Sequence, residues 1–109
     1  MKVNILGTEY TIIECGIEDD KNLKDMDGYC DKTTKKIVVS TPTPDSDLGD
    51  WKVYRNKIMR HEIIHAFLFE SGLHENFEHK QWGHEETFID WVAVQFPKMF
   101  KAFEEAGCL

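Results

Sequence analysis

The segment His61-Glu62-Ile63-Ile64-His65 combines residue types that bind and use a metal ion. On a helix, residues four positions apart lie on one face, so His61 and His65 can direct both imidazoles at a single ion. Glu62 lies beside that stripe, where its carboxylate can reach a water molecule held by the metal. The segment matches the H-E-x-x-H pattern, in which Glu62 is the candidate general base of a metal-assisted hydrolysis.

The alternative is that both histidines belong to the core. Apolar residues and the two histidines recur at helical spacing or widen the same surface: Ile58, His61, Ile63, Ile64, His65, Phe67, Leu68 and Phe69. This pattern predicts a helix that is buried nearly all round. Two histidines and an acid in such a helix need partners for their polar groups, and a metal ion would supply them.

A second helical segment, residues 84 to 96, carries the candidates for a third ligand. Catalytic zinc sites keep three protein ligands and one open position, and two histidines with a glutamate form such a set. Glu86 is favoured, because Asp90 follows it by four residues and can accept the outer N–H of a liganding imidazole. Glu85 and His84 are its rivals, and His84 as a fourth protein ligand would close the site to water.

Other polar groups surround these segments in the sequence. His74 and His79 fall in a polar connection, residues 73 to 83, and are expected to be exposed to solvent. A donor for the oxyanion of a hydrolytic reaction could come from Tyr29, Tyr54, His79 or His84, among which the sequence does not choose.

Short strands and turns are predicted before the first helix. Residues 3 to 15 read as two strands joined by a tight turn, and residues 16 to 34 as a polar, turn-rich connection. Residues 36 to 40 contain a β-branched run that predicts a third strand. We take this strand as a sheet edge along which an extended peptide could pair.

The first helix is predicted from residue 51 to residue 71. Asp47 or Asp50 can serve as its N-cap, and Gly72 can end it. Pro97 predicts a kink or a new start in the second helix, which reaches Glu105 and is capped by Gly107.

Composition restricts the class of protein. The 109 residues predict one domain, 1–109, and the net charge of −7 disfavours nucleic-acid binding. The three cysteines lie far apart, which favours reduced thiols. The chain start shows no secretory signal and no apolar run reaches membrane-spanning length, so we expect a cytoplasmic protein without membrane contact.

The two motifs together resemble those of the gluzincin metallopeptidases, which join H-E-x-x-H to a downstream E-x-x-x-D, here Glu86-Thr87-Phe88-Ile89-Asp90. More narrowly, Glu86 followed by Trp91-Val92-Ala93 and Pro97 looks like the ligand helix of the ImmA/IrrE family, small metallopeptidases of bacteria and their mobile elements. The short hairpin, the Gly28-Tyr29-Cys30-Asp31 turn into an edge strand and the small size also look like zincin-like proteins encoded by phages.

The resemblance implies a zinc ion held by His61, His65 and Glu86, with Asp90 bonded to His61 and Glu62 as general base. It implies a minimal zincin-like α+β domain, in which a small antiparallel sheet of about three strands packs on the H-E-x-x-H helix and a C-terminal ligand helix. The implied activity is peptide-bond hydrolysis, in some members on a regulatory protein of a phage or mobile element, within a bacterial or phage-infected cell. The alternative is a non-catalytic module in which zinc stabilises a binding or regulatory domain.

Overall fold

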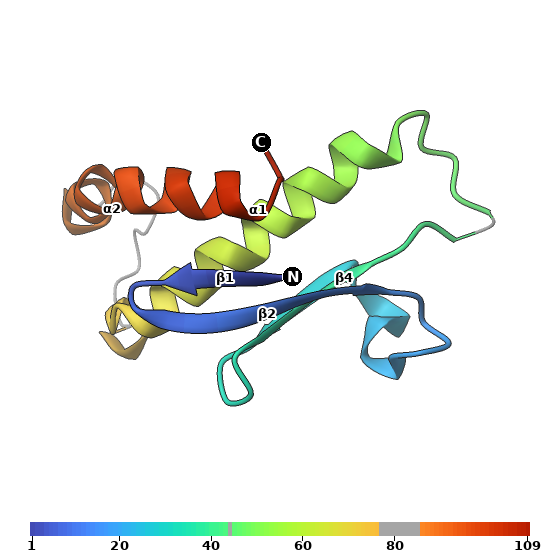
Figure 1. Ribbon diagram of the computed structural model, residues 1–109, viewed down its shortest axis with the longest axis horizontal. Coiled ribbons are helices and arrows are strands. Elements are labelled where there is room, and N and C mark those ends of the chain that lie inside the picture. The colour runs from blue at the N-terminus through green and yellow to red at the C-terminus, as the bar shows by residue number, and fades with distance from the viewer. Residues whose placement is uncertain (44, 77–85) are drawn as a thin grey trace.

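The computed structural model places a four-stranded sheet beneath two helices (Figure 1). It describes residues 1–43, 45–76 and 86–109, and of Asn76, Glu86, Ile89, Asp90 and Ala93 it describes the backbone alone. The fold is α+β, as the sequence predicts. Strand order in the sheet is β1-β2-β4-β3.

The chain opens with the predicted hairpin, formed by β1 (Lys2–Ile5) and β2 (Thr8–Cys15). Leu6 and Gly7 make the turn with positive φ values of 53° and 93°. Two consecutive positive φ values suit the twist of a two-residue hairpin, and glycine adopts the second without steric cost.

The sheet differs from the prediction in strand number and direction. Strand β4 (Lys36–Ser40) pairs with β2 in parallel and with β3 (Gly28–Asp31) in antiparallel orientation. The sheet is therefore mixed, with four strands. The prediction that residues 36–40 form an edge strand was wrong, because β4 has a partner on each side; the edge next to it is β3.

Strand β3 lies inside the segment that the sequence predicts as a connection. That segment also holds a short 3-10 helix, η1 (Lys21–Asp25), capped by the Asp20 side chain. Glycine and aspartate surround these elements and predict turns, whereas the pairing that makes β3 a strand comes from β4, beyond the turn.

Helix α1 (Trp51–Glu70) carries the H-E-x-x-H segment in its second half. Of the two predicted caps, Asp50 is the one used, and it accepts hydrogen bonds from the backbone N–H of Lys52 and Val53 at 3.1 and 3.3 Å. The helix ends before Gly72, whose φ is +81°.

One face of α1 is buried, rather than nearly the whole surface as predicted. The buried side chains are Ile58, Met59, Glu62, Ile63, Ala66 and Phe67. Ile64 and His61 are exposed. The apolar pattern in the sequence therefore overstates the burial of the helix, since it counts His61 and Ile64 as part of the buried surface.

After the 3-10 helix η2 (Leu73–Asn76), the next described element is α2 (Glu86–Glu105), with Pro97 inside it. In Figure 1 the first turns of α2, in orange, are seen nearly along their axis, and the last turns, in red, run across the view. The helix therefore bends, as a proline that removes one backbone bond predicts. Gly107, with φ of +64°, ends it.

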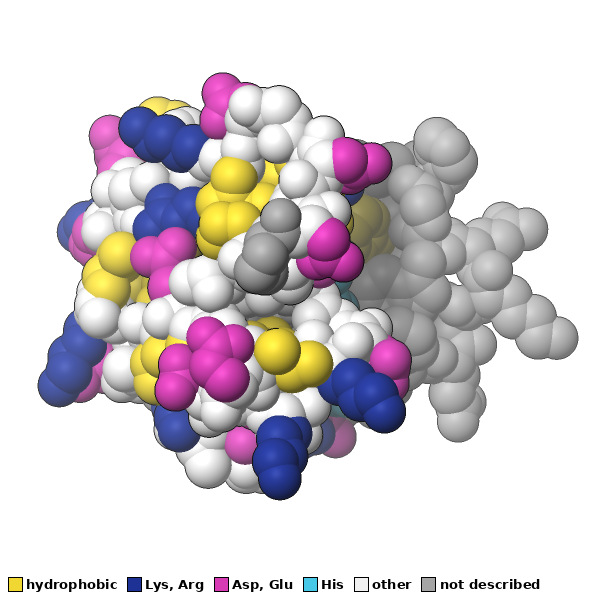
Figure 2. Space-filling model, turned by 90° about the vertical axis from the view of Figure 1, so that its right-hand side faces the viewer, with side chains coloured by type: hydrophobic (Ala, Val, Ile, Leu, Met, Phe, Trp, Pro, Cys, Tyr) yellow, Lys and Arg dark blue, Asp and Glu magenta, His cyan; other side chains and the backbone are white. Residues whose placement is uncertain are grey.

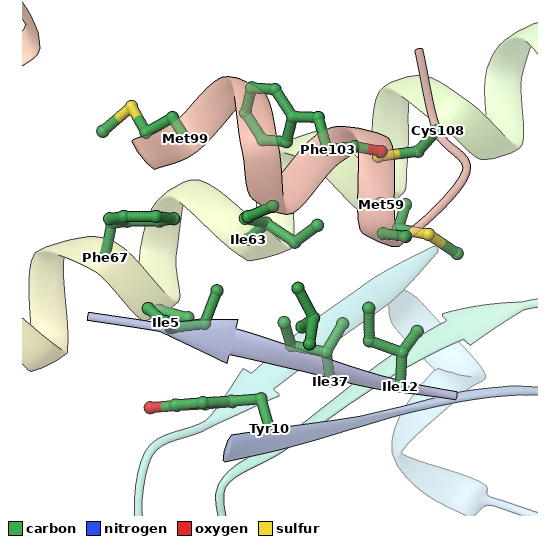
Figure 3. Packing of buried hydrophobic residues seen from close by; sticks show 14 of the residues in the cluster. Ile5, Tyr10, Ile12, Ile37, Met59, Ile63, Phe67, Met99, Phe103 and Cys108 are labelled. Atoms are coloured by element: carbon green, nitrogen blue, oxygen red, sulfur yellow. The ribbon is translucent and has the colours of Figure 1, made fainter. Parts of the chain in front are cut away.

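Both helices cover the same face of the sheet. Helix α1 lies against β3 and β4, and α2 lies against β1 and α1. Figure 3 shows Ile5, Tyr10, Ile12 and Ile37 of the sheet below Met59, Ile63 and Phe67 of α1, with Met99, Phe103 and Cys108 above. This cluster fixes the height of α1 over the sheet.

The surface mixes charges of both signs. On the face in Figure 2, acidic and basic side chains alternate, and neither sign gathers into one patch. In the described ranges, no helix combines the length and the apolar character needed to cross a membrane. All three cysteines are free thiols, as predicted.

Candidate metal centre

His61, Glu62 and His65 form a cluster whose ligand atoms all lie within 4.8 Å of one another, and which could hold a metal ion. The Nε2 atoms of the two histidines are 3.1 Å apart. The rings meet edge to face, with centroids 4.8 Å apart. The helical spacing in the sequence thus brings both imidazoles to one point in space.

The separation of the nitrogens suits a zinc ion. Two nitrogens that each bind one tetrahedral zinc at the usual distance lie about 3.3 Å apart. The observed 3.1 Å is within a few tenths of an ångström of that value. Imidazole nitrogens are also ligands that zinc prefers, so the residues present fit this ion.

Glu62 is the buried member of the cluster, with only 5% of its surface exposed. Oε1 lies 3.7 Å from His61 Nε2, while Oε2 is buried and has no hydrogen-bond partner among the described residues. Burial raises the pKa of this carboxyl to about 7. A carboxyl group buried without a partner is costly, which points to a ligand or a chemical role at this position.

His65 is half-buried and connects the cluster to an aromatic group at the end of α1. Its ring stacks on Phe69 at 6.3 Å, and Phe69 meets the ring of His74 at 4.7 Å. Burial, and next the charges of His61 and His74, lower the pKa of His65, which favours the neutral imidazole that binds metals.

The prediction that His74 is exposed to solvent was wrong. Its side chain is half-buried in η2, because it packs against Phe69. A groove of about 530 Å³ begins beside it and follows β3. The groove is lined by Asn22, Met26, Tyr29, Cys30, Asp31, Lys32, Thr33, Phe69 and His74.

Cys30, in this groove, was not singled out by the sequence as a member of the site. Its thiol is partly buried, and burial, with the nearby Glu62 charge next in effect, raises its pKa to about 12. The group therefore stays a protonated thiol and behaves as a small apolar side chain.

The candidate third ligands belong to the start of α2 and to the residues that precede it in the sequence. The side chains of Glu86 and Asp90 lie outside the described part of the structure, as do residues Glu85, His84 and His79. The backbone of Glu86 begins α2. Trp91 Nε1 donates to Ser71 Oγ at 3.2 Å, which brings the first turns of α2 to the end of α1.

Both tyrosines that could have served as oxyanion donors are engaged elsewhere. The Tyr29 hydroxyl donates to Asp20, and the Tyr54 hydroxyl donates to Asp27 Oδ2 at 2.5 Å. Each bond raises the pKa of its tyrosine. Either hydroxyl would have to leave a carboxylate before it could assist a reaction.

No protein-family model matches this chain, no curated protein is significantly similar to it in sequence, and no solved structure is significantly similar to it. The family resemblance therefore stays a prediction from the two sequence motifs.

Proposed function

We propose that this protein is a zinc-dependent endopeptidase in which Glu62 is the general base. The single observation that carries the proposal is the pairing of two imidazole nitrogens 3.1 Å apart with a neighbouring glutamate, Glu62, that is 5% exposed and has no partner for Oε2 in the described residues. A structural helix would leave such a carboxyl paired or exposed.

His61 and His65 would hold the zinc ion, with Glu86 as third ligand and Asp90 bonded to His61. The start of α2 beside the end of α1 supports this choice of helix. When bound there, zinc would supply a water of near-neutral pKa and polarisation of a peptide carbonyl. His84 as an additional ligand would instead favour the non-catalytic, zinc-stabilised module.

Glu62 would take a proton from the attacking water and pass it to the leaving amine. For this role a base needs a pKa near the working pH, and burial raises that of Glu62 to about 7. Its Oε1 already lies 3.7 Å from His61 Nε2, on the side of the cluster where the metal would be bound.

The free edge of β3 is the position at which an extended peptide would pair. Ser40 N–H donates to Asp27 C=O at 2.8 Å, so these two residues form a hydrogen-bonded pair. Along an antiparallel ladder, hydrogen-bonded and non-hydrogen-bonded pairs then alternate. Tyr29 therefore bonds to β4, while Gly28 and Cys30 direct their N–H and C=O groups away from it. Among the described residues no strand pairs with this edge, and the groove beside Phe69 and His74 would receive side chains of the peptide.

From the resemblance, we propose a regulatory protein of a phage or mobile element as the substrate, cleaved in the cytoplasm of a bacterial or phage-infected cell. Neither a nucleic acid nor a membrane is part of this proposal.

The test is the variant Glu62→Gln, which keeps the size of the side chain and removes the base. Zinc content should stay equal to that of the wild type, because the imidazoles are intact, while cleavage of fluorescein-labelled casein should fall about 10²- to 10⁴-fold. Equal cleavage by both proteins would refute the proposal. Zinc bound by both proteins with cleavage by neither would favour the zinc-stabilised module.

A further inference from the structure

Gly28 lies where α1 comes closest to the edge strand. A Cβ atom built at this position would lie 2.9 Å from Ile58 Cγ2, 2.9 Å from the Val38 carbonyl oxygen and 3.4 Å from Glu62 Cγ. Carbon atoms do not approach other atoms as closely as the first two distances, so any side chain here would force a shift.

The backbone at Gly28 does not itself require glycine. Positive φ values occur at Gly7, Gly72 and Gly107, and Gly28 is not among them. The requirement is one of space, since a glycine inside a strand commonly marks the close approach of another element.

The element that approaches Gly28 is the face of α1 that bears Glu62. Ile58 and Glu62 lie one turn apart on α1 and are 8% and 5% exposed. The methylene stem of Glu62 rests over Gly28, and its carboxyl group continues from there to within 3.7 Å of His61 Nε2. The missing side chain at Gly28 thus lets α1 lie close to β3, with Glu62 in ordinary contact above the glycine. A Cβ atom here would press on Ile58 and displace the helix that carries Glu62.

We propose that Gly28 is a positioning residue, whose bare Cα lets Glu62 place its carboxyl group beside the two imidazoles. This inference rests on the proposed function, because it assigns Gly28 a role through the general base. The three atoms nearest to a Cβ built at Gly28 belong to Ile58, Val38 and Glu62, not to His61 or His65, so metal binding and base placement should respond differently to its substitution.

The chain offers a matched control in Gly49. A Cβ atom at Gly49 would meet nothing within 4 Å, and its φ is not positive. Gly49→Ala therefore adds the same methyl group, with the same effect on the unfolded chain, where there is open space.

The experiment compares Gly28→Ala with Gly49→Ala, using zinc content and the kinetics of fluorescein-labelled casein cleavage. Gly28→Ala should keep its zinc and a KM within about twofold of the wild type, while kcat falls about tenfold to a hundredfold, the cost of a small misplacement of a reacting group. Gly49→Ala should match the wild type throughout. A kcat for Gly28→Ala within twofold of the Gly49→Ala value would overturn the inference.

A crystal structure of Gly28→Ala gives a readout that needs no activity. The Nε2 atoms of His61 and His65 should remain 3.1 Å apart, while Glu62 Oε1 moves beyond 3.7 Å from His61. An unmoved carboxyl group would contradict the inference even if the wild type proves to cleave nothing, so its failure is distinguishable from failure of the proposed function.

If Gly28→Ala does not fold, the substitution is repeated in an Ile58→Ala background, which removes one of the two clashing atoms, Ile58 Cγ2. The double variant should have the zinc content of Ile58→Ala alone and a kcat at least about tenfold lower, because the clash with the Val38 carbonyl oxygen remains and shifts the strand on which Glu62 packs. Equal kcat values would show that Gly28 serves packing against Ile58 only, and would overturn the inference.

Discussion

Glu62 has properties that the sequence pattern alone does not contain. The four-residue spacing of His61 and His65 predicts their meeting, because helix geometry is local. Glu62 is buried where α1 packs over Gly28, more than thirty positions earlier in the chain, and over the β3 strand that β4 pairs with. Only the glycine before a β-prone pair, Tyr29 and Cys30, was available as a sign of this contact.

Two histidines that contact Phe69, His65 and His74, allow a sharp test of the metal site. His65→Ala should reduce bound zinc from roughly one ion per chain to none, since two remaining ligands hold zinc poorly. His74→Ala removes an imidazole that packs on the same phenyl ring from outside the metal cluster, and should leave zinc bound. Elemental analysis after gel filtration measures the zinc content of both variants. If His65→Ala retains zinc, or if His74→Ala loses zinc while His65→Ala does not, the assigned ligands are ruled out.

Elements whose signals are local agree with the sequence: the hairpin, the strand at residues 36 to 40, and α1 with its stop at Gly72. The parallel pairing of β2 with β4 and the edge position of β3 were missed, because strand pairing depends on neighbours distant in sequence. The prediction that residues 36 to 40 form the edge strand was therefore wrong, and the edge lies at β3.

Helix α1 is tied to the sheet at its C-terminal end by Glu70. This carboxylate accepts bonds from Lys35 Nζ at 2.6 Å, Tyr10 Oη at 2.8 Å and Thr8 Oγ1 at 3.1 Å. A negative charge at a helix C-terminus is unfavourable by itself, but charge-assisted bonds to three donors outweigh that effect. The Lys35 bond, first among these, holds the pKa of Glu70 below its ordinary value of 4.5.

Glu70→Gln should lower the free energy of unfolding by about 1 kcal/mol at neutral pH. Because the folded pKa is depressed, the contribution is present above the ordinary value of 4.5 and is lost as pH falls through the lower folded pKa. The difference between wild type and variant, measured by urea unfolding, should therefore shrink below about pH 4.5.

The control for this network is Glu9→Gln, which breaks the exposed pair of Lys2 and Glu9, whose side chains are 67% and 64% exposed. Exposed pairs contribute little, so its stability should follow the wild type at every pH. A Glu70→Gln difference that is constant with pH, or no larger than that of Glu9→Gln, would contradict the role given to Glu70.

At the scale of the whole molecule, two helices on one face of a small sheet leave the H-E-x-x-H segment near the surface. His61 is 64% exposed in its side chain while Glu62 beside it is 7% exposed, so the cluster lies at the boundary between solvent and core. The α+β class could be predicted from the strands and helices, whereas this boundary position required the packed structure.

The measurement that tests the account most directly is a crystal structure with zinc, with anomalous diffraction recorded at the zinc absorption edge. We expect one strong peak about 2.0–2.1 Å from Nε2 of both His61 and His65, with a Glu86 carboxylate oxygen as the next ligand and Glu62 beside the ion without coordinating it. No peak between the two imidazoles, or a zinc ion bound elsewhere on the chain, would contradict the central claim.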